Sequence, residues 1–360
     1  MLNILVFSII IPGKQTHLLK SPLNLILFDF KYFYGRLGAV NEAFMNGVYM
    51  IETIVHKMRE EGYEIRVLAI ERLQDIEKDI ADLHSLNYLD ERIDRILENS
   101  YKFTLPACPF EIKSVIVAAA PCPQTRVVFN CGGSKVPMLI PPTYMEYSVE
   151  PIRIEKCLNE ILAEGNLHAE RVKSLPEKLL AARSGLGSYG RNNIIYVRGM
   201  GSFVLLSVYY SDVECDKENW NEITTMKACA NCSLCRNICP TGAIAEDRYL
   251  VRAERCITYY NEFETAPDFP EWMNPEGHNC IIGCLHCQHC CPQNKRFLDN
   301  IMESVEFDDK ETDSLLNGFP MECLPGETIA KLETIKMDHY YSLLARNMKA
   351  LIYKARRNGE

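Results

Sequence analysis

The pattern of apolar and polar positions predicts helices over residues 41–100. Apolar side chains recur there every three or four residues, which gathers them on one face of a helix. The face of the first helix consists of Phe44, Val48, Ile51 and Val55. A second amphipathic helix is predicted over 90–97, because Ile93, Ile96 and Leu97 fall on one side and charged residues on the other.

Uninterrupted apolar runs predict strands in the middle of the chain. Residues 114–120 form such a run before Pro121, which is typical of a central strand in an α/β sheet. Two more strands are predicted over 193–197 and 202–210, joined as a hairpin by the glycine-bearing turn 198–201. Together with the preceding helices, these strands favour an α/β fold class.

A capping motif precedes the predicted hairpin. Ser174 is expected at the N-cap of a helix with Glu177 reaching back to it, and the helix is expected to end at Gly185. Residues 185–190 then match G-x-G-x-x-G, a dinucleotide fingerprint that normally opens a helix after a strand. Here the order is reversed. We therefore interpret the motif as a tight turn with close backbone approach.

The overall composition is that of an ordinary globular protein. The 360 residues suggest two or three domains, and 47% hydrophobic with 24% charged residues exclude a disordered tail or a membrane bundle. A net charge of −9 argues against charge-driven nucleic-acid binding. The apolar residues 1–12 lack a basic segment and are too short to span a bilayer. We expect a cytoplasmic protein with reduced cysteines.

Cysteine sets this composition apart: the chain has 16, and ten lie between Cys229 and Cys291. The first four follow the spacing C-x2-C-x2-C-x3-C-P, the bacterial ferredoxin pattern for iron–sulfur clusters. A short loop wraps three thiolates around one iron–sulfide cube, while the fourth cysteine belongs to a neighbouring cluster. These four are Cys229, Cys232, Cys235 and Cys239.

A second set of cysteines completes the eight thiolates that two [4Fe-4S] clusters need. It consists of Cys256, Cys284, Cys287 and Cys291. By the exchange rule, one cluster takes Cys229, Cys232, Cys235 and Cys291, and the other takes Cys239, Cys256, Cys284 and Cys287. Cys290 also fits a three-ligand loop. We prefer Cys291 because a proline follows it, as one follows Cys239.

Structural zinc is the alternative for such cysteine pairs, although it leaves the C-x3-C-P endings unexplained. Cys280 and Cys290 are then spare, and His286 and His289 are expected to pack or hydrogen-bond rather than to ligate. Six further cysteines lack ligand spacing and are expected to be buried apolar residues. They are Cys108, Cys122, Cys131, Cys157, Cys215 and Cys323. Because thiolates fill every iron position, the clusters are expected to pass electrons to an acceptor elsewhere.

The order of these motifs resembles the epoxyqueuosine reductase family, which is related to reductive dehalogenases. The resemblance begins with residues 175–190, continues through 201–203 and the cysteine run that ends in C-P-T-G-A-I, and includes 255–257 and 283–292. It covers roughly residues 165–297, whereas the first 110 residues match poorly.

The resemblance implies a nitroreductase-like α/β domain that binds a corrinoid, a two-cluster ferredoxin-like α+β domain and a short helical tail. We assign 1–40 to an N-terminal segment of undetermined role, 41–225 to the α/β domain, 226–300 to the cluster domain and 301–360 to the tail.

Cobalamin is thus an implied cofactor beside the two clusters. Matching family positions put Ile195 and Leu206 beside the corrin, although the residues alone indicate ordinary strand core. The chain has no D-x-H-x-x-G signature, since the segment from Asp82 to Asn87 fails at the glycine. The family that the chain resembles does not use that signature either.

One position departs from the family. The resemblance puts a proton-donating aspartate six residues before the glutamate that matches Glu177, and Arg171 stands there. A guanidinium cannot act as a general acid near neutral pH. Glu170 is expected to face the other way, and Glu177 is explained as the capping residue. Arg171 is expected either to bind an anionic substrate or corrinoid side group, or to be a solvated surface residue.

The sequence therefore predicts an enzyme, an iron–sulfur oxidoreductase that passes single electrons to a corrinoid. We expect an external low-potential donor of ferredoxin or flavodoxin type, an unidentified small-molecule substrate and no membrane contact. Residues 343–347 resemble the point where many members continue into a tRNA-holding helical domain, and the sequence ends soon after. With the acidic charge, this argues against tRNA. The alternatives are a true epoxyqueuosine reductase acting on tRNA and a ferredoxin-like electron-transfer protein without its own substrate.

Overall fold

A four-stranded antiparallel sheet lies at the centre of the part of the chain that precedes the cysteine-rich segment. The computed structural model describes residues 40–85, 89–216, 219–246, 250–262 and 268–358. The strands lie in the order β1 (Glu64–Ala69), β2 (Ser114–Pro121), β8 (Val204–Ser211) and β5 (Ala169–Val172). Residues 115–120 of β2 have no exposed surface, which explains their uninterrupted apolar sequence.

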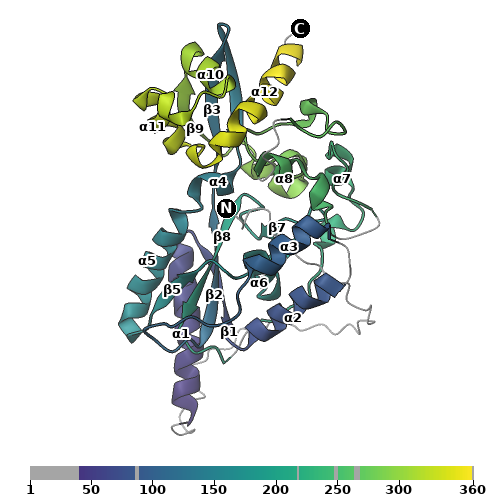
Figure 1. The fold of residues 1–360 in the computed structure, drawn as a ribbon. Coiled ribbons are helices and arrows are strands. Elements are labelled where there is room, and N and C mark those ends of the chain that lie inside the picture. Colours follow the sequence, from purple (N-terminus) through teal and green to yellow (C-terminus); the bar gives the residue numbers. More distant parts are fainter. Residues whose placement is uncertain (1–39, 86–88, 217–218, 247–249, 263–267, 359–360) are drawn as a thin grey trace.

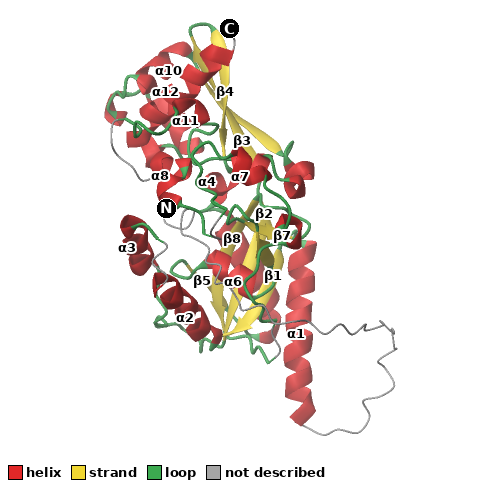
Figure 2. Ribbon diagram, turned by 90° about the vertical axis from the view of Figure 1, so that its right-hand side faces the viewer, coloured by secondary structure: helices red, strands yellow, loops and turns green. Residues whose placement is uncertain are grey.

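Helices cover both faces of this sheet (Figures 1 and 2). One face carries α1 (Val40–Glu60) and α5 (Glu150–Leu162), and the other carries α2 (Arg72–Ser85) and α6 (Glu177–Arg183). Alternate side chains of a strand point to opposite faces, so Ile116 packs with α1 and α5 while Val117 packs with α2 and α6. A short helix, α3 (Glu91–Ser100), follows α2.

A second, three-stranded sheet forms a separate core with the C-terminal helices (Figure 1). Its strands lie in the order β4 (Ser134–Ile140), β3 (Gln124–Cys131) and β9 (Ile301–Phe307), and β9 runs parallel to β3. Phe129 of β3 stacks on Phe307 of β9 with a centroid separation of 4.8 Å. The helices of this core are α4 (Pro142–Glu146), α10 (Asp309–Leu316), α11 (Gly326–Thr334) and α12 (Tyr341–Asn358).

The cysteine-rich segment has little regular structure and lies between the two sheets (Figure 1). Its helices are α7 (Leu234–Ile238), α8 (Ile257–Glu262) and α9 (His286–His289). Just before it in the chain, a small sheet pairs β6 (Gly187–Tyr189) with β7 (Ile195–Val197). Among the described residues, no helix is long and apolar enough to cross a membrane.

Several predicted elements are confirmed. The helix over 90–97 is α3, with Ile93 and Leu97 buried. The run 114–120 is β2, and the tail is helical after Glu327 apart from short turns. In α1, Phe44 and Val48 lie where side chains are not described, and Ile51 and Val55 are half-buried beside the buried Ile54 and Met58.

Three expectations are wrong. The helical stretch 41–100 is interrupted by strand β1, which the prediction of continuous helix missed. The strands over 193–197 and 202–210 do not pair as a hairpin: β7 pairs with β6, and β8 joins β2 and β5. The turn between them exists, with Gly201 bonded to Val197, but it carries the chain from one sheet to the other.

The third error concerns the capping box. Helix α6 begins at Glu177, and its N-cap residue is Pro176 without a side-chain hydrogen bond. Pro176 stands outside the helix at the N-cap, so the helix starts later than Ser174 predicts. Glu177 is therefore the first residue of the helix and not the third, the position that a capping box needs. The glycine motif after α6 does form a close turn: Gly185 has φ 71°, and a Cβ on Gly187 would lie 2.5 Å from Ile195.

Candidate functional site

Four of the predicted cluster ligands line one enclosed space. Cys239, Cys256, Cys284 and Cys287 all border a cavity of about 110 Å³. Cys239 ends α7, Cys256 precedes α8, and Cys287 lies in α9, so three separate turns of the chain converge on this space. This is the set that the exchange rule assigns to one [4Fe-4S] cluster.

The other predicted set gathers around α7 and α9. Burial and the neighbouring thiols of Cys290, Cys229 and Cys232 together raise the pKa of the Cys235 thiol to about 11, which indicates that these sulfurs are close together. The backbone N–H of Arg191 donates to the Cys229 sulfur at 3.4 Å. Cys291 bonds instead to the Tyr196 hydroxyl. Both Cys290 and Cys291 thus lie near this set, and the choice of Cys291 stays a prediction.

The sulfur spacing favours a cluster over mononuclear zinc. Zn–S bonds of roughly 2.3 Å hold tetrahedral ligand atoms within about 4 Å of one another. Within the described ranges, the group of ligand atoms that lies inside 4.8 Å contains no cysteine; it consists of His84, Asp94 and Glu98. In a [4Fe-4S] cube each thiolate binds a different iron at a separate corner, so the four ligands need the wider spacing.

Of the six cysteines without ligand spacing, Cys122 and Cys131 are buried as expected, whereas Cys108, Cys157 and Cys215 are half-buried and Cys323 is exposed. All 16 cysteines lie in the described residues, and no two of them form a disulfide. Cys280 is fully buried beside Phe203 and Leu285. His286 bonds to the Gly277 carbonyl at 2.8 Å, and His289 bonds to the Gln124 side chain at 2.5 Å.

A larger cavity of about 840 Å³ lies against the cysteine-lined one. The two share four wall residues, which are Lys178, Ile194, Thr258 and Cys284. The three residues predicted for corrinoid contact, Ile195, Leu206 and Arg171, all line this larger cavity. Its size falls within the range of roughly 300–1,000 Å³ that is usual for small-molecule sites.

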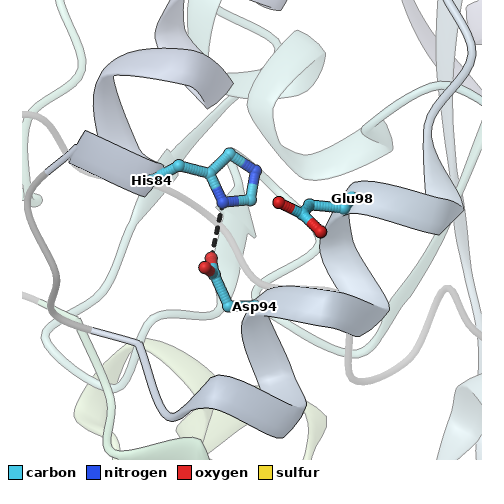
Figure 3. Close-up of side chains that lie close together, drawn as sticks. All are labelled: His84, Asp94 and Glu98. Carbon is cyan, nitrogen blue, oxygen red and sulfur yellow. Dashed lines mark hydrogen bonds and ion pairs between the residues drawn. The ribbon is translucent and has the colours of Figure 1, made fainter.

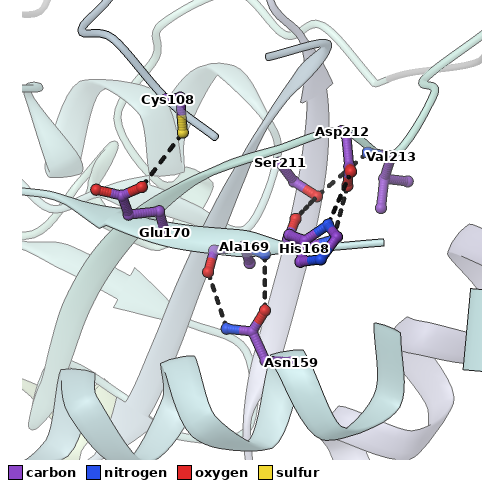
Figure 4. Close-up of polar contacts among 8 residues, drawn as sticks. All are labelled: Cys108, Asn159, His168, Ala169, Glu170, Ser211, Asp212 and Val213. Carbon is purple, nitrogen blue, oxygen red and sulfur yellow. Dashed lines mark hydrogen bonds and ion pairs between the residues drawn. The ribbon is translucent and has the colours of Figure 1, made fainter. Parts of the chain in front are cut away.

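Arg171 is positioned by the edge strand β5 and its neighbours. The Asn159 side chain of α5 both donates to and accepts from the Ala169 backbone, at 2.8 and 2.9 Å, which fixes β5 to α5 (Figure 4). The backbone N–H of Arg171 donates to Glu155, and its guanidinium donates to the Tyr147 carbonyl at 3.0 Å. The exposed Glu170 also lines this cavity, contrary to the expectation that it faces the other way, and it accepts a bond from Cys108 (Figure 4).

A group of half-buried and buried ionisable side chains occupies the cavity wall and the core behind it. Burial raises the pKa of Glu177 to about 8, although Arg171 and Lys178 partly oppose this rise. Burial lowers the pKa of Lys178 and raises those of Glu262 and Tyr144 well above their usual values. The sequence did not indicate that these residues form a group. Glu177 was interpreted as a capping residue, and the other three belong to no motif.

A third group of side chains lies outside both cavities, at the corner between α2 and α3 (Figure 3). The His84 ring bonds to Asp94 at 2.5 Å, and Glu98 lies one helical turn further along α3. Ile93 of the same helix packs with Ala253, Ile257 and Met273 next to the cluster ligands. The pair therefore helps to hold α3 against the cysteine-rich segment.

Comparison with known proteins defines the class of this site first. Residues 228–294 match the family described as a 4Fe-4S double cluster binding domain. The chain thus carries a two-cluster iron–sulfur domain, and the expectation of two [4Fe-4S] clusters is confirmed.

Individual relatives are similar to more of the chain. This chain is 35% identical over 123 residues to the epoxyqueuosine reductase of Atelocyanobacterium thalassa, and the match covers 34% of this chain and 39% of that protein. It is 40% identical over 120 residues to the Escherichia coli enzyme, covering 33% and 30%. The chain therefore spans about a third of the length of these curated relatives.

The fold is similar to solved epoxyqueuosine reductases. The structure from Streptococcus thermophilus matches with a TM-score of 0.56 at 18% identity, covering 85% of this chain and 81% of that one. One from Bacillus subtilis matches with a TM-score of 0.54 at 19% identity, covering 88% and 82%. The predicted resemblance to epoxyqueuosine reductases is thus confirmed over part of the chain, together with a mixed α/β fold.

Two expectations need correction. The main prediction, a corrinoid reductase with an unidentified substrate, is wrong, because the curated relatives are named epoxyqueuosine reductases and support the stated alternative. The prediction of a small-molecule rather than a tRNA partner is wrong for the same reason. The acidic net charge misled the sequence analysis, since a total charge says nothing about one local surface.

Proposed function

We propose that this chain is an epoxyqueuosine reductase that removes the epoxide oxygen of an epoxyqueuosine base in tRNA. The observation that carries the proposal is the contact between the two cavities. A space lined by four cysteines shares wall residues with a substrate-sized cavity, in a chain similar to epoxyqueuosine reductases. Electrons that arrive at the cysteines therefore need to cross only one layer of side chains.

The ligand assignment is part of the proposal. One cluster is held by Cys239, Cys256, Cys284 and Cys287, and it is the cluster next to the larger cavity. The other is held by Cys229, Cys232, Cys235 and Cys291 and is more distant from that cavity. An external donor of ferredoxin or flavodoxin type would reduce the distant cluster first, because the other cluster borders the larger cavity.

Cobalamin is the proposed third cofactor, held by the α/β layer as in a nitroreductase-like fold. The residues fit such a group. Ile195 and Leu206 offer an apolar wall to a flat macrocycle, and Arg171 offers a cation to its polar side groups. Tyr144, also in the wall, has a buried hydroxyl without a hydrogen-bond partner among the described residues. A bound corrinoid would supply a metal that accepts single electrons from the clusters.

The protein's own residues would then orient the base and exclude water. Gly283, next to the ligand Cys284, has φ 67°, and a Cβ there would lie 2.6 Å from the Tyr144 hydroxyl. The close approach keeps the wall between cluster and cavity thin. The reaction needs two electrons and two protons per epoxide, and the oxygen leaves as water.

Anaerobic turnover tests the proposal. The chain is reconstituted with iron and sulfide, with and without cobalamin, and incubated with a low-potential reductant and a tRNA stem loop that contains epoxyqueuosine. We expect the nucleoside to lose the mass of one oxygen atom, as read by mass spectrometry. The exposed Cys323 supplies a control, because Cys323→Ser removes a thiol without ligand spacing and should not change conversion.

Two results would contradict the proposal. Fully loaded protein that leaves the nucleoside unchanged under all conditions is not an epoxyqueuosine reductase. Clusters that exchange electrons with a donor while the nucleoside stays intact would favour the electron-transfer alternative.

A further inference from the structure

The cavity lacks the acid that the family resemblance expects, because position 171 is an arginine. Arg171 is held by Glu155 and by the Tyr147 carbonyl. A guanidinium keeps its proton near neutral pH and cannot protonate a leaving oxygen. An epoxide C–O bond breaks with negative charge developing on oxygen, so some other group has to supply that proton.

The acids that line the cavity can be compared by their contacts. Glu155 accepts the Arg171 backbone N–H at 2.9 Å, so one of its carboxyl oxygens is already engaged with the chain. Glu170 is exposed and accepts the Cys108 thiol. Burial raises the pKa of both Tyr144 and Tyr340 above the usual tyrosine range, so these hydroxyls hold their protons tightly.

Glu177 differs from all of these. It is the first residue of α6, and it lines the cavity together with Lys178 and Ile195. Enclosure by protein raises its pKa to about 8, so it carries a proton near neutral pH. A general acid works best when its pKa lies near the operating pH.

We propose that Glu177 is the general acid of this site and protonates the epoxide oxygen in place of the aspartate that the family has at position 171. This inference rests on the proposed function. Both C–O bonds of the epoxide break, the two clusters supply one electron each, and a C=C bond forms. Glu177 gives one proton to the oxygen, solvent gives the second, water leaves, and solvent reprotonates the carboxylate. A low-potential one-electron donor restores the clusters.

Substitution of Glu177 tests the proposal. Glu177→Gln keeps the shape of the side chain but removes the acidic proton, and should lower the single-turnover rate by roughly 10²–10⁴ with iron content unchanged. Glu160→Gln is the matched control on the exposed side of α5 and should keep the wild-type rate. Adding Arg171→Asp to Glu177→Gln restores a carboxyl at the family position and should recover part of the rate.

The pH profile separates an acid from a structural residue. The wild-type rate should fall as pH rises through about 8, and Glu177→Gln should lose that dependence. The charged and titratable groups that face Glu177 are Arg171, Lys178, Tyr101 and Tyr209. Burial raises the pKa of both tyrosines, which keeps them neutral in this range. Burial lowers the pKa of Lys178, but a limb caused by Lys178 would survive in Glu177→Gln.

The outcomes are distinct. A wild-type rate in Glu177→Gln overturns the assignment. A pH profile of the wild-type protein that does not fall above pH 8 also overturns it, and this measurement holds even if the variant loses its clusters. Fully loaded wild-type protein without turnover overturns the proposed function, and the role of Glu177 with it. An infrared carbonyl band of a protonated carboxyl near pH 7, lost in Glu177→Gln, should accompany the expected result, and its absence from wild type contradicts it.

Discussion

The cysteine-rich segment and the wall of the larger cavity are built in opposite ways. The cluster ligands lie within residues 229–291, at spacings that a short loop imposes. The cavity wall draws on residues as far apart as Pro141 and Tyr340, from both sheets and from the segment between them. The first region carries a chemistry that is independent of the rest of the fold, whereas the second exists only when distant elements come together.

The strongest way to test this difference is to remove one cluster ligand. Cys284→Ser should abolish conversion and lower the iron content by about half, because the thiolate belongs to one cube and also borders the cavity. Iron analysis and visible absorption of anaerobic protein measure this. Cys323→Ser, which removes an exposed thiol, should leave both unchanged. Full iron content in Cys284→Ser would show that the ligand set is wrong.

The next largest effect concerns the choice between two adjacent thiols. Cys291→Ser should remove the cluster near α7, and Cys290→Ser should retain both clusters, because proline follows only Cys291. Electron paramagnetic resonance of the reduced proteins counts the clusters. The reverse result would assign the ligand to Cys290, whose thiol lies close to Cys235.

A change in the cavity should separate the two regions. Leu206→Trp enlarges a half-buried side chain of β8 that lines the larger cavity but not the cysteine-lined one. We expect a loss of roughly 10–200-fold in kcat/KM, the usual effect of an altered pocket contact, with unchanged iron content. Loss of iron in this variant would mean that the two regions fold as one unit.

The smallest expected effect is on stability. A carboxyl whose pKa is raised by folding binds more protons in the native state, so stability falls as pH rises between its unfolded value and about 8 for Glu177. Glu177→Gln should therefore gain stability over wild type as pH rises from 6.5 to 8, on the order of a few degrees in Tm. His278, whose pKa burial lowers to about 4, acts in the opposite direction but only below 6.5. An equal Tm difference at both pH values would contradict the assignment.

The sequence predicts the two regions unequally, for physical reasons. Cysteine spacing is a local property, so the cluster ligands could be proposed from one run of residues and a proline. Strand β2 was also predicted, because burial on both faces leaves an uninterrupted apolar run. Helix α3 was predicted because burial on one face leaves a helical periodicity. Glu177 was misinterpreted, since a capping box depends on where a helix starts and Pro176 delays that start. Lys178, Tyr144 and Glu262 carry no local signal and become a group only through the tertiary fold.

The most direct test of the account is a stoichiometric single turnover. Protein with both clusters reduced, freed of excess reductant and mixed with an equal amount of epoxyqueuosine-containing stem loop, holds two electrons for one epoxide. We predict that both clusters reoxidise while about one product nucleoside forms per chain. Clusters that stay reduced in the presence of bound stem loop, or that reoxidise without loss of the epoxide oxygen, would contradict the coupling of the clusters to the cavity.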